Sequence, residues 1–166
     1  RVVCRRMGGG FGGKETQAAA PAAMAAMVAT LTGRPARLVM SKDDDMRFTG
    51  KRHPFFSRYK IGFNDQGLIL AWHVELFSNG GATTDLSPSV LERAMLHSDN
   101  GYYIPNVRIA GRVCRTNLPS NTAFRGFGGP QGVVGIENAI EEIACKLGKD
   151  ALAVRRLNCY GGEGRE

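Results

Sequence analysis

The tetrapeptide Gly-Phe-Gly-Gly occurs twice in this chain, at 10–13 and at 126–129. Each copy follows a segment predicted as a strand and precedes a segment with helical composition. Glycine adopts positive φ and lets the backbone approach a ligand closely. A strand, a glycine loop and a helix start bring unpaired backbone N–H groups and the positive end of a helix dipole together. This arrangement is typical of an anion site, commonly for phosphate. Two such loops are expected to face one ligand from two sides.

The first loop, MGGGFGGKE, fits two nucleotide-binding patterns incompletely. Gly8, Gly10 and Gly13 satisfy the dinucleotide pattern G-x-G-x-x-G, but no acidic residue stands where that pattern expects one. Lys14 extends a partial P-loop match, but Glu15 replaces the Ser or Thr that would hold Mg²⁺. A third interpretation packs the loop backbone against a large anionic cofactor and directs Glu15 at a neutral or cationic group. A glycine turn without a ligand is the remaining alternative.

A net charge of +7 is compatible with binding to nucleic acid. The basic residues are scattered, with no run of five, and the aromatic residues do not interleave with them, so no nucleic-acid partner is expected. An anionic cofactor or an acidic partner subunit accounts for the charge equally well. No signal peptide and no apolar run of transmembrane length is present, so no membrane partner is expected. The chain starts at Arg1, inside an expected strand, and is interpreted as a segment of a longer protein.

The cysteines and histidines do not form a metal-binding pattern. The four cysteines are far apart without a C-x-x-C pair, and no two of the three histidines fall at metal-ligand spacing. Cys4, Cys114 and Cys145 have apolar neighbours, which predicts small core residues in a reducing compartment.

The order of apolar and glycine-rich segments predicts an α/β (mixed α+β) fold, in which strand–glycine loop–helix units form mixed sheets flanked by helices. A strand–helix–strand unit is expected first, with a helix start capped by Ser41 after it. An antiparallel hairpin follows, broken after residue 77 by Asn79-Gly80-Gly81. A helix capped by Ser87 and ended by Gly101 comes next, then a strand and two helices. The expected strands are 2–6, 36–40, 55–63, 68–77 and 107–116, and the expected helices are 16–31, 88–97, 133–147 and 150–157.

Four segments together carry a family resemblance: MGGGFGGKE, GKRHPF, LERA and LPSNTAFRGFGGPQG. They closely resemble the molybdenum-binding part of xanthine dehydrogenases, which belong with the aldehyde oxidases to the xanthine oxidase family of molybdenum hydroxylases. The resemblance covers essentially the whole chain. It implies that residues 1–160 are part of a molybdenum-cofactor-binding domain. The glycine-rich composition of residues 161–166 predicts a flexible tail.

The resemblance implies residues for the cofactor, molybdenum–molybdopterin. The first loop contributes Gly10, Phe11 and Gly12, and the second loop contributes the run Ala123, Phe124 and Arg125 from the opposite side. Phe11 and Arg125 are expected to contact the molybdenum centre through their backbones.

The resemblance also implies residues for a purine substrate, xanthine or hypoxanthine, which is oxidised to urate. Glu15 hydrogen-bonds the purine, Arg93 faces it from the opposite direction, and Phe127 stacks on its ring. Glu15 and Arg93 are thus the implied catalytic residues, and because aldehyde oxidases usually have apolar residues at these two positions, their presence favours a purine. Without the resemblance, Glu15 would be interpreted as compensating a helix dipole, Arg93 as a surface residue and Phe127 as a core residue.

The resemblance further implies parts that this chain lacks. The family's general-base glutamate, its 2Fe-2S clusters and its FAD belong to other segments or subunits, so the chain alone is expected to be inactive. The parent enzyme is expected to be cytoplasmic and oligomeric. Three alternatives stay open: a sibling hydroxylase of another N-heterocycle or an aldehyde, a nucleotide-binding βαβ module, and a purely structural segment.

Overall fold

A three-stranded sheet forms the centre of the structure, a computed structural model that describes residues 1–161. The order of its strands is β1–β2–β3. β1 (Phe55–Phe63) and β2 (Ile69–Gly81) pair antiparallel, which confirms the predicted hairpin, and β3 (Val107–Arg115) pairs parallel to β2. Exposure alternates along β1 and through most of β2, as expected of strands with one buried face. The mixed sheet agrees with the predicted fold class.

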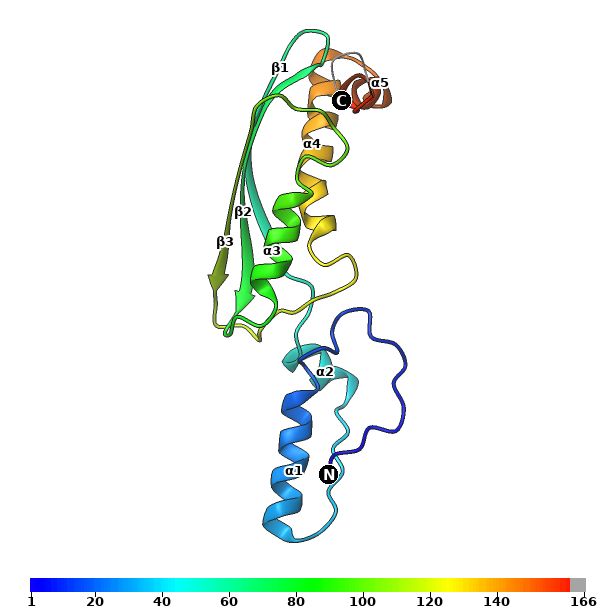
Figure 1. Ribbon diagram of the computed structural model, residues 1–166, viewed down its shortest axis with the longest axis vertical. Coiled ribbons are helices and arrows are strands. Elements are labelled where there is room, and N and C mark those ends of the chain that lie inside the picture. The colour runs from blue at the N-terminus through cyan, green and yellow to red at the C-terminus, as the bar shows by residue number, and fades with distance from the viewer. Residues whose placement is uncertain (162–166) are drawn as a thin grey trace.

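Helices α3 (Ser87–Leu96) and α4 (Gly129–Leu147) lie on one side of this sheet, and α5 (Ala151–Asn158) lies near the far end of α4 (Figure 1). The core forms where β2 faces α4. Its fully buried members include Trp72, Val74, Leu76, Ile136, Ile140 and Ile143. Since these apolar residues recur at period two in the strand and near period 3.6 in the helix, both elements were recognisable from the sequence.

Two glycines, Gly128 and Gly132, let the backbones of α3 and α4 come into direct contact. A Cβ at Gly128 would overlap the carbonyl oxygen of Val90, and one at Gly132 would overlap the carbonyl oxygen of Ala94. Any side chain at either glycine would therefore push α3 away from α4. This close packing fixes α3, the helix that carries Arg93, against the start of α4.

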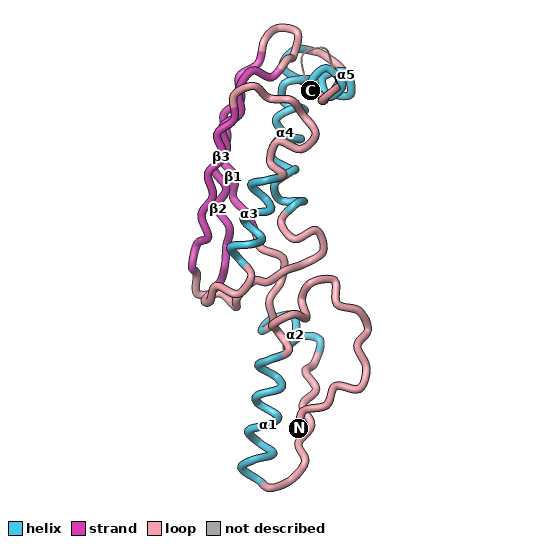
Figure 2. The backbone as a smooth tube through the Cα atoms, in the orientation of Figure 1, coloured by secondary structure: helices cyan, strands magenta, loops and turns pink. Residues whose placement is uncertain are grey.

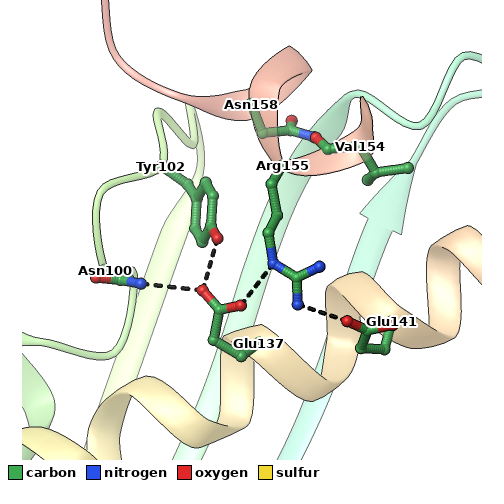
Figure 3. A network of polar contacts seen from close by, with 7 residues as sticks. All are labelled: Asn100, Tyr102, Glu137, Glu141, Val154, Arg155 and Asn158. Carbon is green, nitrogen blue, oxygen red and sulfur yellow. Dashed lines mark hydrogen bonds and ion pairs between the residues drawn. The ribbon is translucent and has the colours of Figure 1, made fainter. Parts of the chain in front are cut away.

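A polar network joins α4 to α5 and to the loop before β3 (Figure 3). The Glu137 carboxylate accepts hydrogen bonds from the Tyr102 hydroxyl (2.6 Å), from Asn100 Nδ2 (3.0 Å) and from Arg155 Nε (2.8 Å). Arg155 also donates to Glu141, at 2.6 Å. Burial alone would raise the pKa of Glu137, but the hydrogen bonds from Tyr102, Arg155 and Asn100 outweigh it and lower the pKa below 4.5. Burial and the bond to Glu137 raise the pKa of Tyr102.

Asn158 closes α5 onto the hairpin. Its side chain is completely buried, accepts from the Ile69 N–H (2.8 Å) and donates to the Gly67 carbonyl (2.9 Å). The helices expected at 133–147 and 150–157 are confirmed: α4 ends at Gly148 in the left-handed conformation, and Asp150 caps α5.

Residues 1–50 form a separate extension beyond one end of the sheet (Figures 1 and 2). It contains α1 (Ala19–Thr32), α2 (Lys42–Phe48) and long loops, and none of its residues is buried. Apolar side chains of α1 are exposed: Met24 by 57%, Met27 by 64% and Leu31 by 80%. This extension therefore has no core of its own, and such apolar exposure is typical of a surface that packs against another part of a protein.

The predicted strand–helix–strand unit is wrong. Its helix exists, with Pro21 in the first turn and left-handed Gly33 at its end, but residues 2–6 and 36–40 form no strand. A strand needs a neighbour for its N–H and C=O groups, and within residues 1–161 neither segment pairs with one. Val3 and Val39 are 59% and 71% exposed, so their apolar character reflects burial that this chain does not supply.

Two other local predictions need correction. β2 continues through Asn79-Gly80-Gly81 instead of breaking there, because Asn79 and Gly81 pair with Cys114 and Arg115 of β3 across a shift in register. α3 ends at Leu96 with His97 as its C-cap, within one residue of the predicted end at 97, so Gly101 is not what ends it.

Ser87 and two cysteines also differ from prediction. Ser87 is the first residue of α3 rather than its N-cap, and its hydroxyl bonds the His53 ring instead. Ser41 does cap α2. Cys4 and Cys145 are exposed rather than in the core, while Cys114 is half-buried.

Among the described residues, every helix is too short or too polar to span a membrane. The expected tail lies outside the described residues except for Gly161.

We expect Glu137→Gln to lower the free energy of unfolding by about 1–3 kcal/mol, because the neutral amide loses charge-assisted hydrogen bonds. Urea unfolding, followed by the fluorescence of the single, buried Trp72, measures this. The folded-state pKa of Glu137 is lowered, so its stabilisation is complete above pH 4.5 and is lost as pH falls through the folded value. The wild type and the variant should converge in acid.

Glu141→Gln is the matched control, because Glu141 shares Arg155 but its side chain is 58% exposed. We expect a smaller loss there. Equal losses for the two variants, or a Glu137 effect that persists in acid, would contradict this account of the network.

Candidate functional site

The two glycine loops meet. Gly12 and Phe124 form an isolated antiparallel bridge, and the Arg125 N–H donates to the Phe11 carbonyl at 2.7 Å. Phe11 and Phe124 therefore lie in adjoining pieces of backbone, although they are far apart in the sequence. The expectation that both loops contribute to one place is confirmed.

The contact requires glycine at position 12. Gly12 has φ 101°, and a Cβ there would lie 2.6 Å from the Ala123 carbonyl oxygen and 2.8 Å from Phe124 Cα. Ala123 is itself only 1% exposed, so it has little room to move away. A side chain at position 12 would separate the two loops.

Two phenylalanines in these loops have left-handed backbone, which is rare for a bulky residue. Phe11 has φ 51° and Phe127 has φ 48°. Residues held in this way typically cost about 1–3 kcal/mol each and cluster at functional sites. Gly126 and Gly128, with φ 92° and 94°, hold Phe127 between two further left-handed residues. Phe127 is half-buried, whereas Phe11 and Phe124 are exposed by 66% and 44%.

Arg52 supports the second loop, a role that the sequence did not predict. Its guanidinium lies 4.7 Å from the centre of the Phe124 ring, and Nη2 donates to the Arg125 carbonyl at 2.6 Å. The N–H and the C=O of Arg125 thus both have protein partners. A contact of Arg125 with a cofactor must use its guanidinium or the second lone pair of that carbonyl. The only available signal was the position of Arg52 within GKRHPF.

His53, next to Arg52, ties this segment to α3. It is 2% exposed, and its Nε2 lies 2.7 Å from Ser87 Oγ. Burial lowers the pKa of His53, while the nearby Asp85 carboxylate opposes that shift. A lowered pKa favours the neutral ring, which suits a hydrogen bond to a serine.

The substrate residues expected from the resemblance are only partly brought together. Arg93, on α3, lies beside the start of α4, since its Nε is 3.9 Å from where a Cβ of Gly129 would be. Arg93 therefore lies near the second glycine loop, which contains Phe127. Glu15 ends the first loop and is exposed. Within residues 1–161, no hydrogen bond or ion pair joins Glu15 to Arg93.

Two hollows among the described residues lie away from the residues expected to bind a substrate. One of about 350 Å³ borders Trp72 and Arg108, and one of about 440 Å³ borders Gly81 and Arg115. Neither is lined by Glu15 or Arg93.

The surroundings of the paired loops offer two features that suit an anionic cofactor, an unpartnered guanidinium nitrogen and the start of a helix. The described residues include no cluster of three His, Cys, Asp or Glu side chains for a metal ion, and the expected backbone contacts of Phe11 and Arg125 need none. Arg52 Nη1 is buried without a hydrogen-bond partner, beside the second loop. That loop runs directly into α4 at Gly129, which brings the positive end of a 19-residue helix to it. These features fit a large anionic group.

The nucleotide-binding βαβ alternative does not fit. No strand precedes the first loop among the described residues, and α1 begins only at Ala19 with no side-chain cap. The helix start therefore lies away from Gly8–Gly13, whereas a phosphate loop places it at the glycines.

A family model described as "Molybdopterin cofactor-binding domain" matches residues 1–159. The chain is 54% identical over 162 residues to "Xanthine dehydrogenase/oxidase" of Rattus norvegicus, which covers 96% of this chain. It is 55% identical over 160 residues to "Xanthine dehydrogenase 1" of Arabidopsis thaliana, which covers 95% of this chain. The chain spans about 12% of the length of each of these relatives.

Solved structures resemble the chain over nearly its whole length. The aldehyde oxidoreductase from Desulfovibrio gigas has a TM-score of 0.83 and 33% identity, with 94% of this chain and 17% of that one covered. Quinoline 2-oxidoreductase from Pseudomonas putida 86 has a TM-score of 0.78 at 24% identity, with 95% and 20% covered, and supports the fold alone. Because 94% of the chain aligns with the aldehyde oxidoreductase, most of the extension of residues 1–50 is part of the similarity.

We expect Gly12→Ala to separate the two loops, because Ala would be strained at φ 101° and its Cβ would meet the Ala123 carbonyl. Hydrogen exchange of the Arg125 amide, which donates to Phe11, measures this and should become faster. Gly13→Ala is the control, since a Cβ at Gly13 has no atom within 4 Å. Equal exchange in the two variants would contradict the proposed packing.

Proposed function

Because this chain belongs to the molybdopterin cofactor-binding domain family, we propose that it is the segment of a xanthine dehydrogenase that forms one side of the cofactor and substrate site. The observation that carries this proposal is the pairing of the two glycine loops at Gly12 and Phe124. The two relatives named above, both called xanthine dehydrogenases, support the choice within the family. The whole reaction belongs to the parent enzyme.

Six residues of the paired loops are proposed to hold the molybdenum–molybdopterin cofactor: Gly10, Phe11, Gly12, Ala123, Phe124 and Arg125. The strained backbone at Phe11 and the support of Arg125 by Arg52 hold these loops in one shape before a ligand binds. Pre-ordered loops bind with less loss of conformational entropy. When bound, the cofactor supplies the two-electron oxidation that no side chain of this segment can perform.

Three side chains are proposed to bind and orient a purine. Arg93 presents a guanidinium, which can stabilise negative charge that develops on the heterocycle. Glu15 can hold or share a proton with a ring nitrogen. Phe127, fixed by its left-handed backbone, offers an aromatic face for offset stacking on a flat ring.

The remaining walls of the site are proposed to come from the rest of the parent enzyme. The exposed apolar face of α1 and the absence of any buried residue in 1–50 support burial of this extension by that remainder. The parent is proposed to carry 2Fe-2S clusters and FAD in other segments or subunits, and to be oligomeric. Its proposed location is the cytoplasm, with which the four free thiols are compatible.

An aldehyde is the second candidate substrate, because an aldehyde oxidoreductase is among the similar structures at 33% identity. Two oppositely charged residues suit a heterocycle with both ring N–H donors and ring nitrogen acceptors better than they suit an aldehyde. We therefore favour the purine, and the variants below separate the two candidates.

In the intact parent enzyme we expect Arg93→Met to lower kcat/KM for xanthine by about 10²–10³-fold, the usual cost of one lost donor to developing charge. Glu15→Gln should also lower it. Arg58→Met, on the outer face of β1, is the charge-matched control and should leave turnover unchanged. Unaffected purine turnover in both site variants would make the xanthine assignment wrong, and a gain in aldehyde oxidation would favour the second candidate.

The 166-residue chain alone is expected to oxidise no xanthine, since the walls of its site are incomplete. Urate formation, followed by absorbance with the purified chain and an artificial electron acceptor, tests this. Detectable turnover would contradict the proposal that this segment is only one side of the site.

A further inference from the structure

One carboxylate connects the first glycine loop to α3. Asp85 Oδ1 accepts from the Thr16 hydroxyl at 2.7 Å, and Asp85 Oδ2 accepts from Gln17 Nε2 at 2.9 Å. Thr16 directly follows Glu15, and Asp85 lies two residues before Ser87, the first residue of α3. We call these three residues, Thr16, Gln17 and Asp85, the Asp85 junction.

Both sides of the Asp85 junction are held in place by further contacts. Gln17 uses its other side-chain atom, Oε1, to accept from the Gly50 N–H at 2.7 Å. Ser87 is bonded to His53 at 2.7 Å. The junction is therefore anchored to the segment 50–53 from the loop side and from the helix side.

The backbone of Asp85 is itself unusual. Its φ is 42°, in the left-handed region that few residues other than Gly, Asn and Asp adopt. An acidic residue held there, with both carboxylate oxygens bonded to one short segment, has a defined orientation. The geometry thus suits a fixed connection better than a solvated surface charge.

We propose that Asp85 is a positioning residue that fixes the Glu15 loop to α3 and so sets where Glu15 lies relative to Arg93. Glu15 and Arg93 have no direct bond within the described residues, and the Asp85 junction connects the segments that carry them. The effect of Asp85 on substrate turnover rests on the proposed function of Glu15 and Arg93. The effect of Asp85 on the order of the first loop can be measured separately.

The test uses the intact, cofactor-containing parent enzyme and four variants. Asp85→Gly removes the carboxylate and tolerates the left-handed backbone, whereas Asp85→Asn keeps one acceptor oxygen. Thr16→Val removes one donor from the loop side. Asp65→Asn, at an exposed site in the β1–β2 turn, is the matched control. Each variant is measured by hydrogen exchange of the Ala19 and Gly50 amides, which donate to the Thr16 carbonyl and to Gln17 Oε1, and by kcat/KM for xanthine.

We expect Asp85→Gly to speed exchange of the Ala19 and Gly50 amides by about tenfold, the usual effect of losing hydrogen bonds to a charged group. Asp85→Asn and Thr16→Val should have smaller effects, and Asp65→Asn none. We also expect Asp85→Gly to lower kcat/KM by about tenfold when Glu15 is present but by less than about twofold in a Glu15→Gln background. That non-additivity distinguishes positioning of Glu15 from general destabilisation.

Unchanged exchange in both Asp85→Gly and Thr16→Val would overturn the proposal, as would an equal loss of kcat/KM in the two backgrounds. If Asp85→Gly does not fold, Thr16→Val and Asp85→Asn decide by the same two measurements. If Glu15→Gln alone leaves turnover intact, the proposed function fails, and the exchange rates alone then decide whether Asp85 fixes the loop.

Discussion

The backbone contact between Gly12 and the Ala123–Phe124 peptide is the constraint on which the candidate site depends. It brings together two loops that are remote in sequence, and it leaves no volume for a side chain at position 12. Arg52 then holds the second loop, and Asp85 holds the residues that follow the first. These contacts involve both the backbone and the side chains of the two loop segments, so the loops are ordered by the protein before any ligand is considered.

The residues that stabilise the described chain and the residues of the candidate site lie in different parts of the structure. The buried apolar residues lie between the sheet and its helices, and the Glu137 network closes the end of that unit remote from residues 1–50 (Figure 3). The glycine loops lie where that unit meets the extension of residues 1–50. Substitutions in the Glu137 network are therefore expected to act on unfolding, and substitutions in the loops on ligand binding.

Much of the sheet and helix unit was predictable because its signals are local. The hairpin alternates at period two, α4 ends at a left-handed glycine, and α5 begins at a capping aspartate. The strands expected at 2–6 and 36–40 failed because strand pairing depends on a neighbour that the described chain does not provide. The site residues came from the family resemblance. Neither the local signals nor the resemblance predicted the roles of Arg52 and Asp85, because their partners, Arg125 and Thr16, are distant in sequence.

The absence of buried residues in 1–50 has a consequence for synthesis on the ribosome. This extension leaves the exit tunnel before the strands do, and the loop at Gly12 cannot find its partner until residue 124 has emerged. The apolar side chains of α1 stay uncovered throughout that interval and after it, since they are exposed in the folded chain as well. Nascent chains with uncovered apolar surface are prone to aggregate, and chaperones exist to shield them. The newly made chain is therefore expected to need such protection until another part of the protein covers α1.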